Sequence, residues 1–191
     1  MKNKLTIKQD EFQQEIDLND FIDGDISEDA ELVREIAQGL IDYMVARVEA
    51  GKGIGGVDLN DTKYSTNYKK SLPFQAASKG SKVNMTLTGD MLRAIDLLDE
   101  DGSTIIIGID DEIERAKAYG HQSGFKNHPT IKGVKERRFF GVTADEIKKV
   151  LKGFSSAIKE STSSRKYSDT QEQEAAIDYV VNARTLAEIF K

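Results

Sequence analysis

The sequence predicts an α+β fold in which a small, mostly antiparallel sheet packs against two long amphipathic helices. Two observations lead to this fold class. Apolar residues recur at three- and four-residue intervals over residues 27–50 and 143–160, which is typical of helices with one buried face. Short runs of strand character, bounded by turn residues, occur at residues 83–87, 104–109 and 137–142. A further strand is expected from the N-terminal residues or from residues 125–135.

The composition is that of a soluble globular chain. The 191 residues are 31% charged and 38% hydrophobic, with a net charge of −6, which suits one domain with extensions and excludes a disordered chain. No stretch approaches the roughly 18 apolar residues of a membrane span, and the start lacks the apolar run of a signal peptide. With no cysteine, disulfides and thiolate chemistry are excluded.

Residues 1–26 are expected to form a polar N-terminal arm. Leu5 and Ile7 suit a short edge strand. The rest of the arm contains isolated apolar side chains, namely Phe12, Ile16, Leu18, Phe21 and Ile22. These are too few to make a core, so we expect the arm to dock on the 27–160 core domain or on a neighbouring subunit.

The first long helix is predicted from residue 27, with Ser27 as its N-cap and Gly51 ending it. Its buried face comprises Val33, Ile36, Ala37, Leu40, Ile41, Met44 and Val48. Residues 51–56 then read GKGIGG, a literal match to the dinucleotide-binding pattern G-x-G-x-x-G. That pattern requires a strand before it and a helix after it, whereas here a helix precedes it. We therefore interpret GKGIGG as a flexible loop that ends the helix.

The middle of the chain alternates between predicted strands and helices. After the strand at 83–87, Thr88-Gly89-Asp90 marks a helix start, and helical spacing follows at Met91, Leu92, Ile95 and Leu98. Asp101-Gly102 is a turn. Residues 104–109 have no polar face, so we predict a strand covered on both sides. Gly108 indicates a bulge or a close approach of backbone.

A short helix is predicted from Asp110 to about Gly120, and the only two histidines, His121 and His128, follow it. A hydrolytic metal site would need these histidines and the acidic residues Asp110, Asp111 and Glu112. The spacing matches no ligand pattern such as H-E-x-x-H. The interpretation favoured by the spacing is that His121 bonds backbone at a turn.

Residues 125–138 are the most basic part of the chain and are predicted to form a long exposed loop. The strand at 137–142 would then return to the core, with Phe139 and Phe140 facing opposite sides, one toward the core and one toward an interface. Thr143 and Glu146 form a capping box for the second long helix. The polar composition after residue 160 predicts a linker and a last helix, so residues 161–191 form an extension.

Charge is distributed unevenly. Residues 1–50 contain 13 acidic and 5 basic side chains, whereas residues 125–152 contain 3 acidic and 8 basic ones. Such asymmetry is compatible with subunit contacts, with a nucleic-acid surface, or with an ordinary solvated surface. Tyr64 and Tyr68 lie beside three lysines. This arrangement would suit base stacking, but tyrosines four residues apart more often pack on a core.

Four sequence blocks occur in order between residues 87 and 150: LTGDMLRAI at 87–95, IG at 107–108, AYGHQ-x-G at 118–124, and RRFFGV at 137–142 followed by the Thr-capped helix with Asp145. In order and spacing they resemble the tail-completion, or virion-morphogenesis, proteins of tailed bacteriophages, the Mu-type branch in particular. The resemblance covers about a third of the chain closely and residues 27–86 loosely.

The resemblance implies a structural neck protein without a catalytic site. Such proteins form rings, usually six-fold, that join the head connector to the tail terminator or tail tube and let DNA pass without sequence specificity. They belong to the virion neck and are assembled in the host cytoplasm. We accordingly expect no enzyme activity, catalytic residue, cofactor, metal or membrane partner.

A closed ring needs two different patches that meet between neighbouring subunits. The candidate interface residues are Lys126, Lys132, Lys135, Arg137, Arg138, Phe140, His121, Phe12, Phe21 and Phe190. Opposite charge on the N-terminal region and on the basic loop would supply the two patches. Two rival functions stay open: a nucleic-acid-binding module that uses residues 125–138 with Tyr64 and Tyr68, and a metal-dependent hydrolase around the two histidines. The net charge of −6 counts against the first.

Overall fold

The structure is a computed structural model that describes residues 6–8, 12–59, 66–76, 89–124 and 136–163. The chain divides into two units, Met1–Gly153 and Phe154–Lys191. The second unit contains a helical stretch over residues 155–163. The strands and the first long helix belong to the first unit, and the fold class is α+β, as the sequence predicts.

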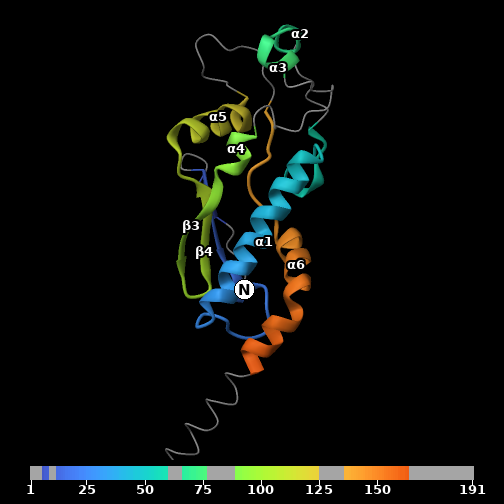
Figure 1. Ribbon diagram of the computed structural model, residues 1–191. Helices are drawn as coiled ribbons and strands as arrows, with labels where there is room; N and C mark the ends of the chain where they lie inside the picture. Colours follow the sequence, from blue (N-terminus) through green and yellow to red (C-terminus); the bar gives the residue numbers. More distant parts are fainter. Residues whose placement is uncertain (1–5, 9–11, 60–65, 77–88, 125–135, 164–191) are drawn as a thin grey trace, which may run out of the picture. The chain divides into compact units, whose positions relative to one another are not determined.

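Four antiparallel strands form the sheet in the order β1-β2-β4-β3 (Figure 1). They are β1 (Thr6–Lys8), β2 (Gln13–Asp17), β3 (Ile95–Asp101) and β4 (Thr104–Ile109). β3 and β4 form a hairpin in which Asp101 pairs with Thr104. Gly102 occupies the turn at φ +57°, a backbone conformation that glycine adopts without strain, which accounts for the predicted turn.

Residues 6–8 and 13–17 of the predicted N-terminal arm are strands of the sheet. β2 lies in the interior of the sheet, where Ile16 pairs with Ile105 of β4. The predicted edge strand near Ile7 is present as β1. Ile16 and Leu18 are fully buried, so the docking of these residues occurs on the body of the same chain.

The helix predicted from Asp90 through Leu98 is wrong beyond its first turn. α4 covers only Asp90–Arg93, and Ile95 already begins β3 by pairing with Ile109. The spacing of the apolar residues is compatible with a helix and also with the observed strand. In the strand, a bulge between Leu97 and Asp99 shifts the register and so interrupts the regular alternation of faces. The predicted strand at 83–87 lies outside the described residues.

Gly108 marks a close approach, as predicted. A Cβ atom at this position would lie 2.6 Å from Leu98 Cδ1 and 2.9 Å from the carbonyl oxygen of Phe12. The bulge itself is on β3, opposite Ile106 and Ile107, while Gly108 pairs with Asp96. The missing side chain therefore leaves room for Leu98 to lie across the sheet.

The first long helix, α1 (Ala30–Glu49), contacts the sheet and also α6 (Figure 1). Its seven predicted apolar residues are all buried. The N-cap is Asp29 and not Ser27, because the Asp29 carboxylate accepts from the amide of Leu32 at 3.1 Å. Gly51 follows the helix at φ +79°, in agreement with the predicted helix end.

The other helices are short. α5 (Glu112–Ser123) starts from the N-cap Asp111 instead of Asp110, and it continues past His121 to Gly124, which adopts φ +69°. α6 (Ala144–Leu151) starts with the predicted capping box. The remaining helical elements are η1 (Leu18–Asp20), η2 (Ile54–Gly56), α2 (Thr66–Lys69), α3 (Leu72–Ala76) and η4 (Lys152–Phe154).

We predict that Gly108→Ala lowers the free energy of unfolding by about 1–3 kcal/mol, because the new methyl group meets a backbone carbonyl that cannot move freely. Gly153→Ala is the matched control, since nothing lies within 4 Å of a Cβ there. Urea unfolding of both variants measures the difference. Equal stability of the two would contradict the close approach at Gly108.

Candidate functional site

Residues 137–142, which contain the last block of the phage-like pattern, do not form the predicted strand. The segment crosses the core without pairing to any strand among the described residues. Phe139, Phe140 and Val142 are at most 2% exposed. A buried backbone must find other hydrogen-bond partners, so the question is where its amides and carbonyls are bonded.

Two glutamine side chains bond the amides of this segment. The Gln14 side chain accepts from the amide of Val142 at 2.8 Å and donates to its carbonyl at 2.8 Å, which reproduces the bonding of a paired strand residue. The Gln122 side-chain oxygen accepts from the amides of Phe139 and Phe140 at 3.0 and 3.3 Å. The segment is thereby fixed to β2 on one side and to α5 on the other.

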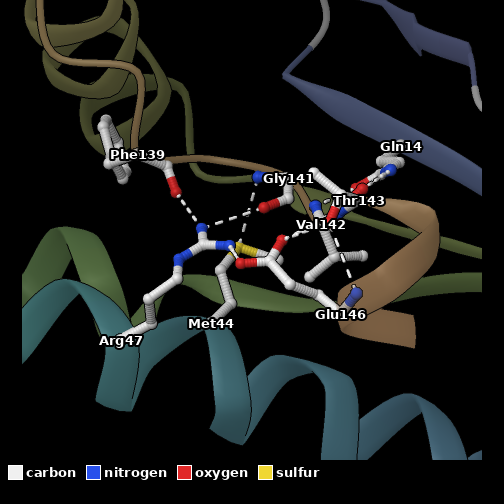
Figure 2. Close-up of polar contacts among 8 residues, drawn as sticks. All are labelled: Gln14, Met44, Arg47, Phe139, Gly141, Val142, Thr143 and Glu146. Carbon is white, nitrogen blue, oxygen red and sulfur yellow. Dashed lines mark hydrogen bonds and ion pairs between the residues drawn. The ribbon is translucent and has the colours of Figure 1, made fainter. Parts of the chain in front are cut away.

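Arg47 of α1 bonds the carbonyls. Figure 2 shows its guanidinium donating to the carbonyl oxygens of Phe139 and Gly141, at 2.6 and 2.9 Å, and to the Glu146 carboxylate at 2.8 Å. The second Glu146 oxygen accepts from the amide and hydroxyl of Thr143. One buried ion pair therefore joins α1, the segment and the start of α6.

The ionised state of Glu146 depends on these partners. Burial by itself raises the pKa of this carboxyl, but the hydrogen bonds from Thr143 and the charge of Arg47 lower it more, so the net pKa lies below its ordinary value. The Arg47 and Glu146 side chains are 5% and 9% exposed. A pair this buried destabilises the fold strongly when only one partner is removed.

The GKGIGG loop holds the segment from a further side. The amide of Ile54 donates to the carbonyl of Arg138 at 2.9 Å, and a Cβ atom on Gly53 would lie 2.5 Å from that same oxygen. The glycine at position 53 is therefore required for contact with the segment. This contact is a structural role that the sequence interpretation of the loop did not anticipate.

His121 and Arg137 join the two described ends that flank residues 125–135. The amide of Arg137 donates to the carbonyl of His121 at 2.9 Å, and the Arg137 guanidinium lies 3.3 Å from His121 Nδ1. Burial and then the positive charge of Arg137 lower the pKa of His121 to about 4. The expectation that His121 bonds backbone at a turn is not confirmed, because His121 lies within helix α5 and its ring Nδ1 lies beside the Arg137 guanidinium.

Several predicted interface residues lie in the core. Phe12 packs against Phe139 and Phe140, with ring centroids 6.1 and 4.9 Å apart, and all three are at most 2% exposed. The expectation that one of Phe139 and Phe140 faces an interface is wrong, because the alternation of a strand does not apply to this segment. Arg137 is also buried.

The other predicted interface residues are at the surface or outside the described chain. Arg138 is exposed, and Phe21 and His121 are half-buried. Tyr68 falls in α2. The predicted residues that lie outside the described ranges are Lys126, Lys132, Lys135, Phe190, Tyr64 and His128.

The acidic residues considered for a metal site are remote from His121. Asp111 caps the start of α5 and His121 lies in its last turn, which separates them by about 15 Å along the helix axis. Among the residues that the structure describes, no group of three or more histidine or acidic side chains could hold a metal ion. No described helix has the length and apolar character to cross a membrane.

The sequence patterns did not identify the residues that bond the segment. Each of these residues is a polar side chain that lies buried among apolar neighbours, namely Gln14, Arg47 and Gln122. For Arg47 a signal was present, since it lies between Met44 and Val48 on the apolar face of α1, where a charged side chain needs a partner.

Comparison with known proteins adds no relative. No protein-family description matches the sequence, and neither the curated proteins nor the solved structures yield a significant match.

We predict that Arg47→Met lowers the free energy of unfolding by about 3–5 kcal/mol, because it removes the buried positive charge beside Glu146 and the donor to one oxygen of that carboxylate and to two carbonyl oxygens. The double variant Arg47→Met/Glu146→Gln should be less destabilised than the sum of its two single variants. Chemical denaturation measures this cycle. Arg34→Met, which removes an exposed pair with Glu100, is the control and should change stability by less than about 1 kcal/mol.

We also predict a loss of stability below neutral pH that depends on His121. A histidine whose folded-state pKa is about 4 binds its proton more weakly than in the unfolded chain, so stability falls as the pH is lowered from about 6.5 to 4. The loss is at most about 3 kcal/mol. His121→Gln should remove this part of the pH dependence in urea titrations between pH 7 and 4. An unchanged slope in the variant would contradict the assignment.

Proposed function

We propose that the protein is a structural neck component of a tailed phage, a ring-forming subunit of the tail-completion type. It would connect the head connector to the tail around the DNA channel. The proposal starts from the four ordered sequence blocks, whose order and spacing resemble that group of phage proteins.

The observation that supports the proposal most is that residues of the sequence blocks make hydrogen bonds inside the subunit. Gln122 of the third block bonds the amides of Phe139 and Phe140 of the fourth. Thr143, directly after the fourth block, caps α6 with Glu146. Side chains of the pattern are thus engaged in bonding backbone and neighbouring helices, which is the role expected of residues that fix the shape of a building block.

The chemistry of this region favours the same conclusion. Phe139, Phe140 and Val142 are buried, so they present no surface to a substrate. Arg47 and Glu146 neutralise each other in the interior. A subunit whose most distinctive residues hold its own core would exert its function through surfaces that meet other subunits.

The test is the oligomeric state of the purified protein. We expect a ring, about six times the subunit mass, in light scattering or native mass spectrometry, with a central opening in electron micrographs. A subunit that stays monomeric at high concentration overturns the proposal.

A parallel measurement addresses the alternative of nucleic-acid binding. Anisotropy titrations with labelled duplex DNA at several salt concentrations would give tight, steeply salt-dependent binding by the isolated subunit if that alternative holds. We expect only weak binding, because the chain has a net charge of −6. Tight binding by a monomer would favour the alternative.

A further inference from the structure

The outward face of the sheet lies on the side away from the buried isoleucines. In the β2–β4–β3 register, Ile105 and Ile107 point inward and are fully buried, so Ile106 points outward. Ile106 pairs with Glu15 on one side and with Asp99 on the other. Ile106 is half-buried and both acids are exposed, so no described element covers this part of the face.

This face combines an apolar centre with an acidic rim. Ile106 and Leu98 contribute to an open hollow whose polar lining includes Asp96, Asp99 and Asp110. Leu98 lies across Gly108 within contact distance of a Cβ there. No ion pair among the described residues neutralises Glu15, Asp96 or Asp99. A sheet face with several acidic side chains around apolar ones is suited to a basic, partly apolar partner.

The edge of the sheet is a poorer place for that partner. The edge strand beside this hollow is β3, and two of its amides already donate to side chains, Leu97 to Asp96 and Glu100 to Asp99, at 2.8 and 2.9 Å. Acidic side chains along an edge also discourage another strand from adding to it. The partner therefore contacts the face through its side chains.

The chain itself contains a segment of the complementary chemistry. Residues 125–138 include five basic side chains and one acidic one, together with apolar Phe125, Ile131 and Val134. The flanking residues His121 and Arg137 are bonded to each other, so both ends of this segment attach to the body at one place.

A neighbouring copy's segment reaches this face more readily than the chain's own. The hollow includes Asp110 and Asp111 at the start of α5, whereas the segment begins at the other end of that helix, about 18 Å away. The 11 residues of 125–135, tethered at both ends, extend at most about 19 Å from their attachment. For residues 125–135 to reach the hollow of their own chain, both halves of this segment would have to be fully extended along α5.

We propose that the outward face of the β2–β4–β3 sheet, centred on Ile106 between Glu15 and Asp99, binds the basic segment 125–138 of the adjacent copy. This inference rests on the proposed function and identifies the two different patches that ring closure needs. The sequence analysis assigned the acidic patch to the N-terminal region as a whole, whereas this proposal assigns it to one defined surface of the sheet. Arg137 is excluded from the contact because it is buried.

The experiment uses two charge-reversed full-length proteins. Glu15→Lys/Asp99→Lys makes the centre of the sheet face, around Ile106, basic, and Lys126→Glu/Lys132→Glu/Lys135→Glu changes the net charge of residues 125–138 from +4 to −2. Each variant alone repels its own copies, so its dissociation constant for assembly should rise at least ten-fold. An equimolar mixture restores both kinds of contact, face to segment and segment to face, and should assemble like the unmodified protein in light scattering.

The control is Glu35→Lys/Asp42→Lys, which makes the same charge change at two exposed positions of α1. It should assemble normally. Circular dichroism and thermal melting establish that each variant is folded. If Glu15→Lys/Asp99→Lys does not fold, the milder Glu15→Gln/Asp99→Asn replaces it; this variant should assemble more weakly than the unmodified protein, and its assembly should depend less on salt concentration.

Other outcomes contradict the proposal in distinguishable ways. Normal assembly of Glu15→Lys/Asp99→Lys would show that the face is not an interface, while the ring function would stand. Failure of the mixture to assemble would indicate that each segment covers the face of its own chain, or that another partner does. A monomeric unmodified protein would overturn both this inference and the proposed function.

Discussion

The structure depends on the hydrogen bonding of one buried stretch of backbone. Five consecutive amides, from Phe139 to Thr143, donate to side chains and not to other backbone groups. A polar group that is buried in an apolar interior without a hydrogen-bond partner is strongly destabilising. Each side chain that bonds this backbone must therefore keep its position in the folded protein. Gln14, Arg47 and Gln122 come from β2, α1 and α5, and their convergence on one segment fixes these three elements around it. Figure 2 shows the contacts of Gln14 and Arg47.

The elements that sequence reasoning predicted well are those governed by local periodicity or local chemistry. The apolar stripe of α1, the strand β4 and the capping box at Thr143 are each specified by residues within a few positions of one another. The expectation that β4 is covered on both sides is wrong at Ile106, which is half-buried on the outward face. The predictions that failed depend on distant partners. Ile95 joins a strand because Ile109 pairs with it, and that pairing overrides helical spacing.

The difference between local patterns and distant partners also explains how much of the candidate site could be predicted. The aromatic pair at 139–140 was expected near the core, but its environment could not be predicted, since Gln14 and Gln122 reach it from other parts of the chain. The sequence alone does not reveal that a side chain such as Gln14 makes the backbone hydrogen bonds that a neighbouring strand would otherwise make. Charge asymmetry was visible in the sequence, whereas only the strand register places Glu15 and Asp99 on either side of Ile106.

The position of β2 inside the sheet has a consequence for biosynthesis. Ile16 emerges from the ribosome early, but its partner Ile105 is translated much later, and Phe12 must wait longer still for Phe139 and Phe140. Until then the nascent chain holds these apolar side chains without their native cover. The core is therefore completed only after residues 139–140 have been translated, and contacts this distant in sequence are formed slowly.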